Sequence, residues 1–185
     1  MSLEQASAQI KGKLGTKVKL KIARENKPEF EVAIARAQIE LPSVSYTLNQ
    51  EQGSKVGYIK LDEFSSHAAE QMQKAIADLS QKDASGFILD LRGNPGGLLF
   101  SGVEIARMWM SQGAIVSTID RKGGNEQFSA NGQALTDLPL VVLVDGYSAS
   151  ASEILTGALK ENNRAKVVGS RTYGKGTVQS ICPIF

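Results

Sequence analysis

Apolar and polar residues alternate along the chain with two periods, and these periods predict its elements. Apolar residues three or four positions apart predict a helix over 3–13, while strict alternation predicts strands over 18–22 and, less regularly, over 30–39. From residue 44 onward the two patterns follow each other. The predicted strands are 56–61, 86–91, 114–119, 138–144 and 165–168, and the predicted helices are 68–79, 98–110 and 150–159.

Strands that alternate with helices are typical of an α/β fold with a largely parallel sheet, whose functional groups gather where strands lead into helices. The polar, glycine-containing stretch 122–133 is expected to form a hairpin or a surface loop. Residues 1–36 are too few to build a core of their own. We therefore expect a small N-terminal piece, 1–36, followed by a main domain over 37–185.

Composition and charge narrow the classes of function. The 185 residues include 42% hydrophobic and 22% charged residues, as in ordinary folded domains, and a net charge of +2 does not favour a nucleic-acid partner. Cys182 is the single cysteine, which excludes an intrachain disulfide and a cysteine-based metal site. The sequence shows neither an apolar run that could span a bilayer nor a signal peptide at its start.

Two turns between a strand and a helix could carry chemistry. The glycine loop, 90–97 (DLRGNPGG), precedes a helix whose first N–H groups are unpaired, so it could bind an anion or an oxyanion, although a plain tight turn explains it equally well. The serine turn, 146–153 (GYSASASE), could present a nucleophile at a helix N-terminus. The same serines fit a helix cap, and the pattern S-A-S-E fits a capping box.

A nucleophilic serine needs a base, and the chain offers two kinds. His67 is the only histidine, and its place at a helix start is typical of a surface residue. Lys175 lies between two glycines, where burial could lower its pKa, and Gln179 follows four residues later. The segment 169–176 nearly matches a phosphate-binding loop, but Gly176 replaces the required hydroxyl and a strand pattern over 177–181 replaces the helix. No nucleotide site is therefore expected.

Together these stretches resemble the carboxyl-terminal processing proteases, also called tail-specific proteases, which use a serine and a lysine. The matching stretches are DLRGNPGG (90–97), SASASEI (148–154) and VGSRTYGKGTVQ (168–179). The resemblance implies that Ser150 is the nucleophile, Lys175 the general base and Gln179 the residue that orients the lysine. It also implies an oxyanion hole made by the backbone amides of Gly96 and Ala151, with no metal or other cofactor.

The resemblance also implies the wider organisation. It predicts a spiral core like that of Clp protease and crotonase, incomplete at its C-terminal end, and makes 1–36 the last part of a PDZ domain. The expected substrates are proteins with apolar C-terminal tails, cleaved outside the cytoplasm in a periplasm or thylakoid lumen, by a protein that could form homo-oligomers. Two alternatives stay open: a module that binds C-terminal peptides without cutting them, and an acyl-CoA-handling enzyme with the crotonase fold.

Overall fold

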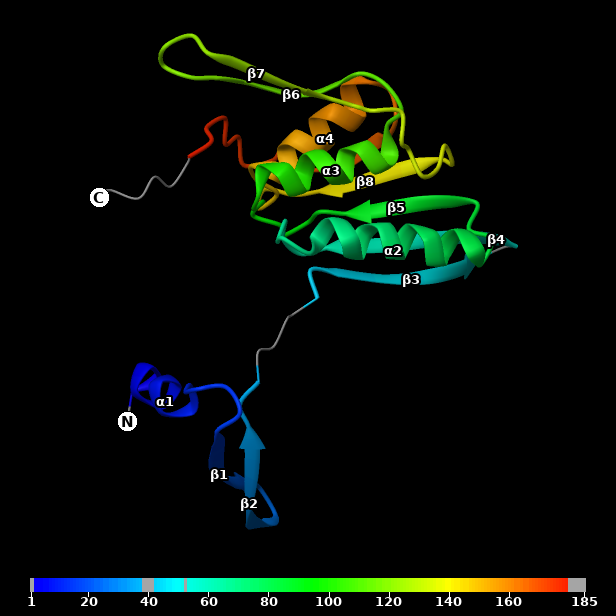
Figure 1. Ribbon diagram of the computed structural model, residues 1–185. Coiled ribbons are helices and arrows are strands. Elements are labelled where there is room, and N and C mark those ends of the chain that lie inside the picture. The colour runs from blue at the N-terminus through cyan, green and yellow to red at the C-terminus, as the bar shows by residue number, and fades with distance from the viewer. Residues whose placement is uncertain (1, 38–41, 52, 180–185) are drawn as a thin grey trace. The chain divides into compact units, whose positions relative to one another are not determined.

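The computed structural model describes residues 2–37, 42–51 and 53–179 (Figure 1). Contacts between residues divide the chain into two units, 1–41 and 42–185. This boundary lies close to the one expected near residue 36. Within the described ranges, no helix is both long and apolar enough to cross a lipid bilayer.

Unit 1 is a short helix followed by a hairpin. Helix α1 (Leu3–Ile10) begins with a capping box between Ser2 and Gln5, and strands β1 (Lys17–Arg24) and β2 (Lys27–Ala35) pair antiparallel. No residue of these three elements is buried. Unit 1 therefore holds the predicted helix and two strands but no core of its own. The last two residues of the strand expected over 30–39 lie outside the described residues.

Unit 2 contains a five-stranded sheet in the order β3-β4-β5-β8-β9. Four strands are parallel, and β3 pairs antiparallel with β4 at the edge of the sheet. The predicted largely parallel sheet is thus confirmed, whereas β3 was not predicted. The strands are β3 (Val44–Glu51), β4 (Ser54–Leu61), β5 (Gly86–Asp90), β8 (Leu140–Val144) and β9 (Lys166–Gly169).

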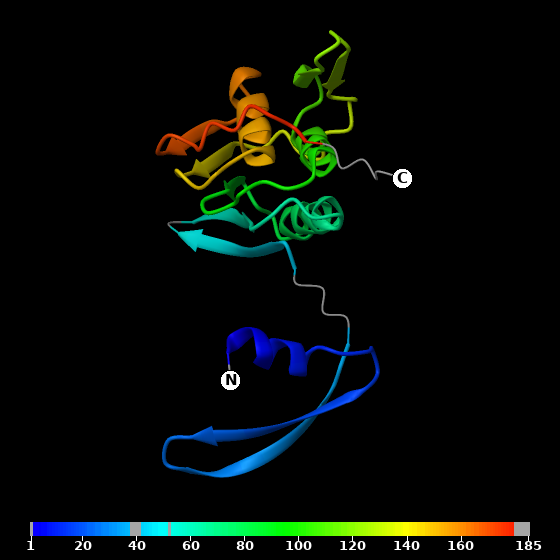
Figure 2. The ribbon, with the colours of Figure 1, turned by 90° about the vertical axis from the view of Figure 1, so that its left-hand side faces the viewer.

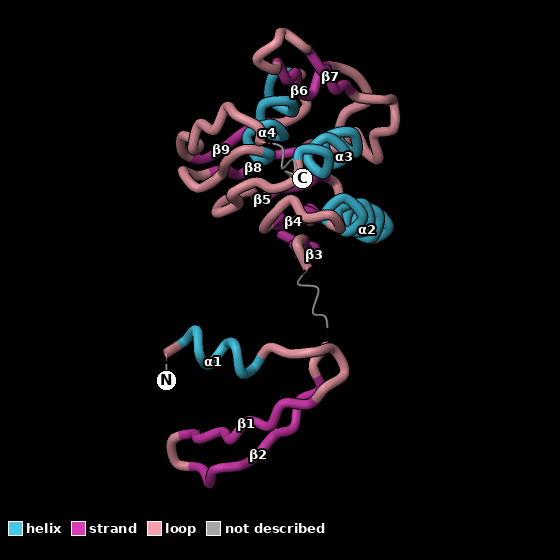
Figure 3. The backbone as a smooth tube through the Cα atoms, turned by 60° about the vertical axis from the view of Figure 1, so that its left-hand side comes forward, coloured by secondary structure: helices cyan, strands magenta, loops and turns pink. Residues whose placement is uncertain are grey.

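Three helices lie along one face of this sheet: α2 (Ala68–Gln81), α3 (Leu99–Trp109) and α4 (Ala151–Glu161). Figures 2 and 3 show these helices as one layer that lies against the layer of strands. Strand order advances in one direction from β4 to β9. Because crossovers between parallel strands are right-handed, such an order places all the connecting helices on the same face.

The expected hairpin is confirmed, and one expected strand is wrong. Strands β6 (Ala114–Ile119) and β7 (Asn125–Ser129) pair antiparallel around the glycine-containing turn. In contrast, residues 177–179 have no regular structure, and 180–181 lie outside the described residues. The alternating pattern there has no neighbouring strand to pair with in the described part of the chain.

The hydrophobic core lies between the sheet and the helices of unit 2. Trp109, at the end of α3, is fully buried and meets the Phe87 ring of β5 edge-on, with 5.3 Å between the ring centroids. The other large, fully buried side chains are Ile59, Leu61, Phe64, Met72, Ile76, Leu79, Leu89, Leu91, Ile105 and Met110. Buried residues of β5 and β8 belong to this core, and Val167 of β9 packs against it. β5, β8 and β9 are parallel neighbours, so their carboxyl ends lie side by side. The glycine loop, the serine turn and the segment that carries Lys175 therefore all begin at the same end of the sheet.

Candidate active site

The three serines of the serine turn differ in exposure and in partners. Ser148 and Ser152 are fully buried, and their hydroxyls donate hydrogen bonds to the carbonyl oxygens of Leu91 at 2.8 Å and Asn94 at 3.0 Å. Both serines therefore fasten the serine turn to the glycine loop. Ser150, between them, is only partly buried. Of the three, it is the one that is not fully buried.

Ser150 also has the backbone conformation of a strained turn. Its φ is 56° and its ψ is −115°, outside the regions that L-residues usually adopt. Such strain is common in turns that present functional groups. Helix α4 begins at the next residue, Ala151, whose N–H finds no acceptor within the described residues. The positive end of the helix and an unpaired N–H therefore lie beside the Ser150 hydroxyl.

Gly96 packs directly against this turn. Its φ is 100°, and a Cβ atom there would lie 2.6 Å from the Ala149 oxygen and 2.8 Å from the Ser150 Cβ. Only glycine fits this position. The Gly96 N–H, however, already donates to the Asn94 side chain oxygen at 2.8 Å, and the Gly96 carbonyl accepts from the Phe64 N–H at 2.9 Å.

These two hydrogen bonds also fix the direction of the next amide, the Gly97 N–H. In a planar trans peptide the N–H and the preceding C=O point in opposite directions, so the Gly97 N–H points away from Phe64. Gly97 is exposed, and its N–H has no acceptor in the described part of the chain. Of the two predicted oxyanion donors, the structure thus leaves Ala151 free and Gly96 occupied. Gly97 was not predicted from the sequence, because the hydrogen bonds of Gly96 to Asn94 and Phe64 decide which glycine amide is free.

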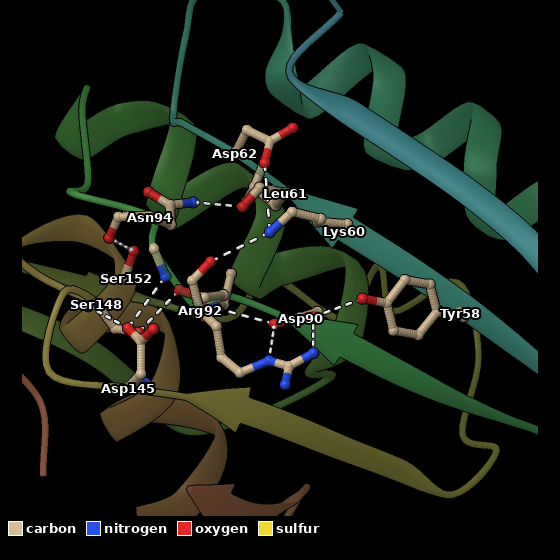
Figure 4. A network of polar contacts seen from close by, with 12 residues as sticks. Tyr58, Lys60, Leu61, Asp62, Asp90, Arg92, Asn94, Asp145, Ser148 and Ser152 are labelled. Carbon is tan, nitrogen blue, oxygen red and sulfur yellow. Dashed lines mark hydrogen bonds and ion pairs between the residues drawn. The ribbon is translucent and has the colours of Figure 1, made fainter. Parts of the chain in front are cut away.

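Two carboxylates hold the loops in place (Figure 4). Asp145 accepts hydrogen bonds from the N–H groups of Gly93 at 3.0 Å, Tyr147 at 3.0 Å and Ser148 at 3.1 Å. The bond from Gly93 is the largest cause of a lowered pKa of Asp145, against which burial acts. Asp145 therefore joins the glycine loop to the serine turn as a charged group.

Asp90, at the end of β5, is almost fully buried. Burial alone would raise its pKa, but hydrogen bonds from Arg92 and Tyr58 lower the pKa to about 2. The Arg92 guanidinium binds both oxygens, at 2.9 and 2.6 Å, and the Tyr58 hydroxyl donates to one of them (Figure 4). This network secures the first residues of the glycine loop.

Glu153 joins Ser150 to residues 172–175, the lysine segment. One of its oxygens accepts the N–H groups of both Ser150 and Lys175, each at 2.9 Å. The other accepts the Thr172 hydroxyl at 2.7 Å and the Gly174 N–H at 2.6 Å. Burial would raise the pKa of Glu153, but these four hydrogen bonds lower it. The sequence analysis identified Glu153 only as part of a capping box, so this second function was missed.

The side chains of the predicted dyad are not joined in this structure. Lys175 is exposed, and its amine makes no hydrogen bond to the Ser150 hydroxyl among the described residues. The Gln179 amide donates to Thr177 at 3.4 Å rather than to the lysine. The main chains of Ser150 and Lys175 thus meet on one carboxylate, while the orientation of the amine and of Gln179 stays a prediction.

Among the described residues, no three His, Cys, Asp or Glu side chains gather as a metal ion would require. His67 is the N-cap residue of α2 and therefore lies at a helix start, as predicted.

Comparisons with known proteins identify the family of this chain. Residues 55–184 match the model of peptidase family S41. The chain is 47% identical, over 98% of its length, to a carboxyl-terminal-processing protease from Synechocystis, of which it covers 43%. It is 39% identical, again over 98% of its length, to the carboxy-terminal processing protease CtpB of Bacillus subtilis, of which it covers 38%.

A solved structure, the photosystem II D1 C-terminal processing protease, aligns with all of this chain at a TM-score of 0.71 and 32% identity, and 51% of that protein is covered. The chain therefore spans about half or less of the length of these relatives. Because the family model covers most of the chain and includes all three loops of the site, the chain belongs to peptidase family S41.

Proposed function

We propose that this chain forms the catalytic part of a serine peptidase that cleaves protein substrates near their C-terminus. The observation that carries the proposal is the placement of Ser150: partly exposed, strained, at the N-terminus of α4 and against Gly96. Membership of family S41 and the names of the relatives support the same activity.

In the proposed mechanism the neutral amine of Lys175 takes the proton of the Ser150 hydroxyl, whose oxygen attacks a peptide carbonyl carbon. The tetrahedral intermediate collapses, the C–N bond breaks, and the lysine returns the proton to the leaving amine. Lys175 then takes a proton from a water molecule whose oxygen attacks the acyl-enzyme ester. The ester C–O bond breaks, the cleaved peptide leaves with a new carboxyl group, and the proton passes from Lys175 to the Ser150 oxygen. Gln179 would orient the lysine amine without adding a charge.

The lysine must move its side chain to take this part. Its main chain is already fixed beside Ser150 through Glu153, and its long, flexible stem allows the amine to swing toward the hydroxyl. A bound substrate that covers the exposed amine would exclude water and favour its neutral form. Glu153 thus supports the proposal by setting the distance between the two main chains.

The oxyanion is proposed to bind the Ala151 N–H and one N–H of the glycine loop. Gly96 can donate only if its hydrogen bond to Asn94 is given up or shared. The Gly97 N–H is already unpaired, which favours it as the second donor. Loss of one such donor lowers turnover by about 10²–10³.

The remaining organisation is proposed from the family resemblance. Unit 1 would be the last part of a PDZ domain, which captures peptide C-termini by strand addition, and unit 2 part of a core like that of Clp protease and crotonase. Apolar C-terminal tails would be the substrates. The relatives' processing function supports a location in a periplasm or thylakoid lumen, and homo-oligomers are compatible with the proposal.

The test compares variants of the longest natural chain that contains this sequence. Cleavage of a peptide with an apolar C-terminal tail should fall at least 10³-fold in Ser150→Ala and in Lys175→Ala, because removal of a nucleophile or its base leaves only binding and oxyanion effects. Lys160→Ala, at the exposed end of α4, is the matched control and should cleave like the unchanged protein. Unchanged cleavage in either site variant would refute the proposal.

A further inference from the structure

Asn94 is a fully buried residue that connects three segments of unit 2. Its side chain nitrogen donates to the Leu61 carbonyl at the end of β4, at 2.8 Å, and its side chain oxygen accepts the Gly96 N–H, also at 2.8 Å. Its main-chain carbonyl accepts the Ala149 N–H and the Ser152 hydroxyl, each at 3.0 Å. Figure 4 shows Asn94 between the end of β4 and Ser152.

We propose that Asn94 is a positioning residue that sets the amides of the glycine loop against the Ser150 turn. This inference rests on the proposed serine peptidase function. The main chain of Asn94 holds the serine turn through two hydrogen bonds, while its side chain holds the glycine loop on the sheet. The same residue therefore fixes both partners of the oxyanion site relative to each other.

The chemistry of the side chain explains why an asparagine stands here. The buried site requires one donor, toward the Leu61 carbonyl, and one acceptor, toward the Gly96 N–H. An asparagine amide supplies both, whereas an aspartate supplies no donor and an alanine supplies neither. A buried carbonyl or N–H without a hydrogen-bond partner costs free energy. With aspartate or alanine at position 94, the glycine loop would therefore shift until these groups find other partners.

The orientation of the free amide follows from these contacts. The Gly96 N–H is held by Asn94 and the Gly96 carbonyl by Phe64, so both sides of this residue are fixed. The Gly97 N–H then has one direction, away from Phe64. Oxyanion donors must be held within a few tenths of an ångström to act in the transition state, and Asn94 supplies this precision.

The first test compares Asn94→Ala with Asn162→Ala in the longest natural chain. Asn162 is the matched control, because its amide also donates to two carbonyls, those of Ala114 and Ala158, but at the far end of α4. In Asn94→Ala, kcat should fall by about 10², with KM changed less than threefold, because the lost contact acts on the transition state. The affinity for a peptide boronate, whose tetrahedral adduct has an oxygen in the oxyanion position, should fall in the same proportion.

The second variant, Asn94→Asp, adds a pH readout that a purely structural residue would not give. Burial against the Leu61 carbonyl should raise the pKa of the new carboxyl. Its protonated form has an O–H for Leu61 and an oxygen for the Gly96 N–H, and so restores both contacts. The kcat of this variant relative to the unchanged protein should therefore rise as the pH is lowered from 8 toward 5.

Three results would overturn the inference: a kcat loss in Asn94→Ala no larger than in Asn162→Ala, a loss confined to KM, or a pH-independent ratio for Asn94→Asp. If Asn94→Ala does not fold, the pH-dependent ratio alone decides. Ser150→Ala, measured in parallel, separates the two claims. If it is inactive while the Asn94 variants keep their kcat, the inference fails and the proposed function stands; if it is active, the proposed function itself fails.

Discussion

Ser148, Ser150 and Ser152 are the same residue type in one short turn, but their hydrogen-bond partners and their exposure differ. The sequence motif identifies three serines in alternation, for which a helix cap and a nucleophile were both open interpretations. Ser150 is the N-cap of α4, within a capping box that includes Glu153, so the predicted cap is confirmed. The structure separates the three: two hydroxyls are buried on carbonyl oxygens of the glycine loop, and Ser150 is left partly exposed in a strained turn. Such a division of hydrogen bonds cannot be read from spacing alone, because the partners are more than fifty residues away.

Gly96→Ala tests the contact between the glycine loop and Ser150. The new methyl group would meet the Ala149 oxygen and the Ser150 Cβ and would require a φ of 100°, so the loop must move. We expect kcat to fall about 10²–10³-fold, as after loss of an oxyanion donor. Gly157→Ala on α4 is the control, since nothing lies within 4 Å of its Cβ. Equal activity of the two variants in a peptide cleavage assay would contradict the proposed geometry.

Glu153→Gln tests the link between Ser150 and the lysine segment. A glutamine offers one acceptor oxygen where two oxygens now receive four donors, so contacts to the lysine segment are lost. Hydrogen bonds to a charged group contribute about 1.5–3 kcal/mol, so turnover should fall about 10- to 100-fold. Glu104→Gln, on the exposed side of α3, is the control and should stay within twofold.

The pH dependence of the same carboxylate has a definite sign. Because the pKa of Glu153 is lowered in the folded protein, its contribution to stability is present above the ordinary glutamate pKa and is lost as the pH falls through the folded value. At pH 7 the unchanged protein should thus be more stable than Glu153→Gln, and this difference in the free energy of unfolding should shrink as the pH falls below the ordinary glutamate pKa. A difference that stays constant with pH, measured by urea unfolding followed by circular dichroism, would contradict the assignment.

Most helices and strands of unit 2 were predicted from the sequence, and the predictions that failed have identifiable causes. Strands β4, β5 and β8 and all three helices were predicted because their apolar periods match their burial. Strand β3 was missed although Val44, Tyr46 and Leu48 alternate with polar residues, because it is an edge strand whose pairing depends on the turn at Gly53. The strand expected over 177–181 failed for the opposite reason, since an alternating pattern without a partner strand forms none.

Asp90 tests how β5 and the glycine loop are held together. Its pKa of about 2 implies that the carboxylate stabilises the fold at neutral pH and that this contribution is lost as the pH falls from about 4 to about 2. The lowered pKa corresponds to about 2 kcal/mol. Asp90→Asn should lower the free energy of urea unfolding by that amount at pH 7. The difference from the unchanged protein should vanish near pH 2, and a constant difference across this range would contradict the assignment.

At the scale of the whole molecule, the core belongs to unit 2 alone. Its buried hydrophobic residues all lie between Val44 and Leu159, and the elements of unit 1 contain no buried residue. A chain that begins at Pro42 should therefore keep the free energy of unfolding of the longer chain to within about 0.5 kcal/mol, as expected when no core contact is removed. Loss of cooperative unfolding in denaturant would show that unit 1 supports the core.

The arrangement of the three loops on neighbouring strands explains how residues far apart in the sequence come together. Ser150, the glycine loop and Lys175 are far apart in sequence, and the parallel order of β5, β8 and β9 brings their loops to one edge. The sequence predicted this convergence because alternation of strands and helices implies it. The positions of the lysine amine and of Gln179 could not be predicted from the sequence, because they depend on side-chain orientations in an irregular segment.

The proposed function depends on the activation of Ser150 by Lys175. Mass spectrometry of the longest natural chain, trapped with a slowly hydrolysed peptide acylating probe, gives the number and the position of the adducts. We predict one adduct per chain, on Ser150, and a rate of formation at least 10³-fold lower in Lys175→Ala. An adduct on another residue, or equally fast labelling of Ser150 without the lysine, would contradict the claim.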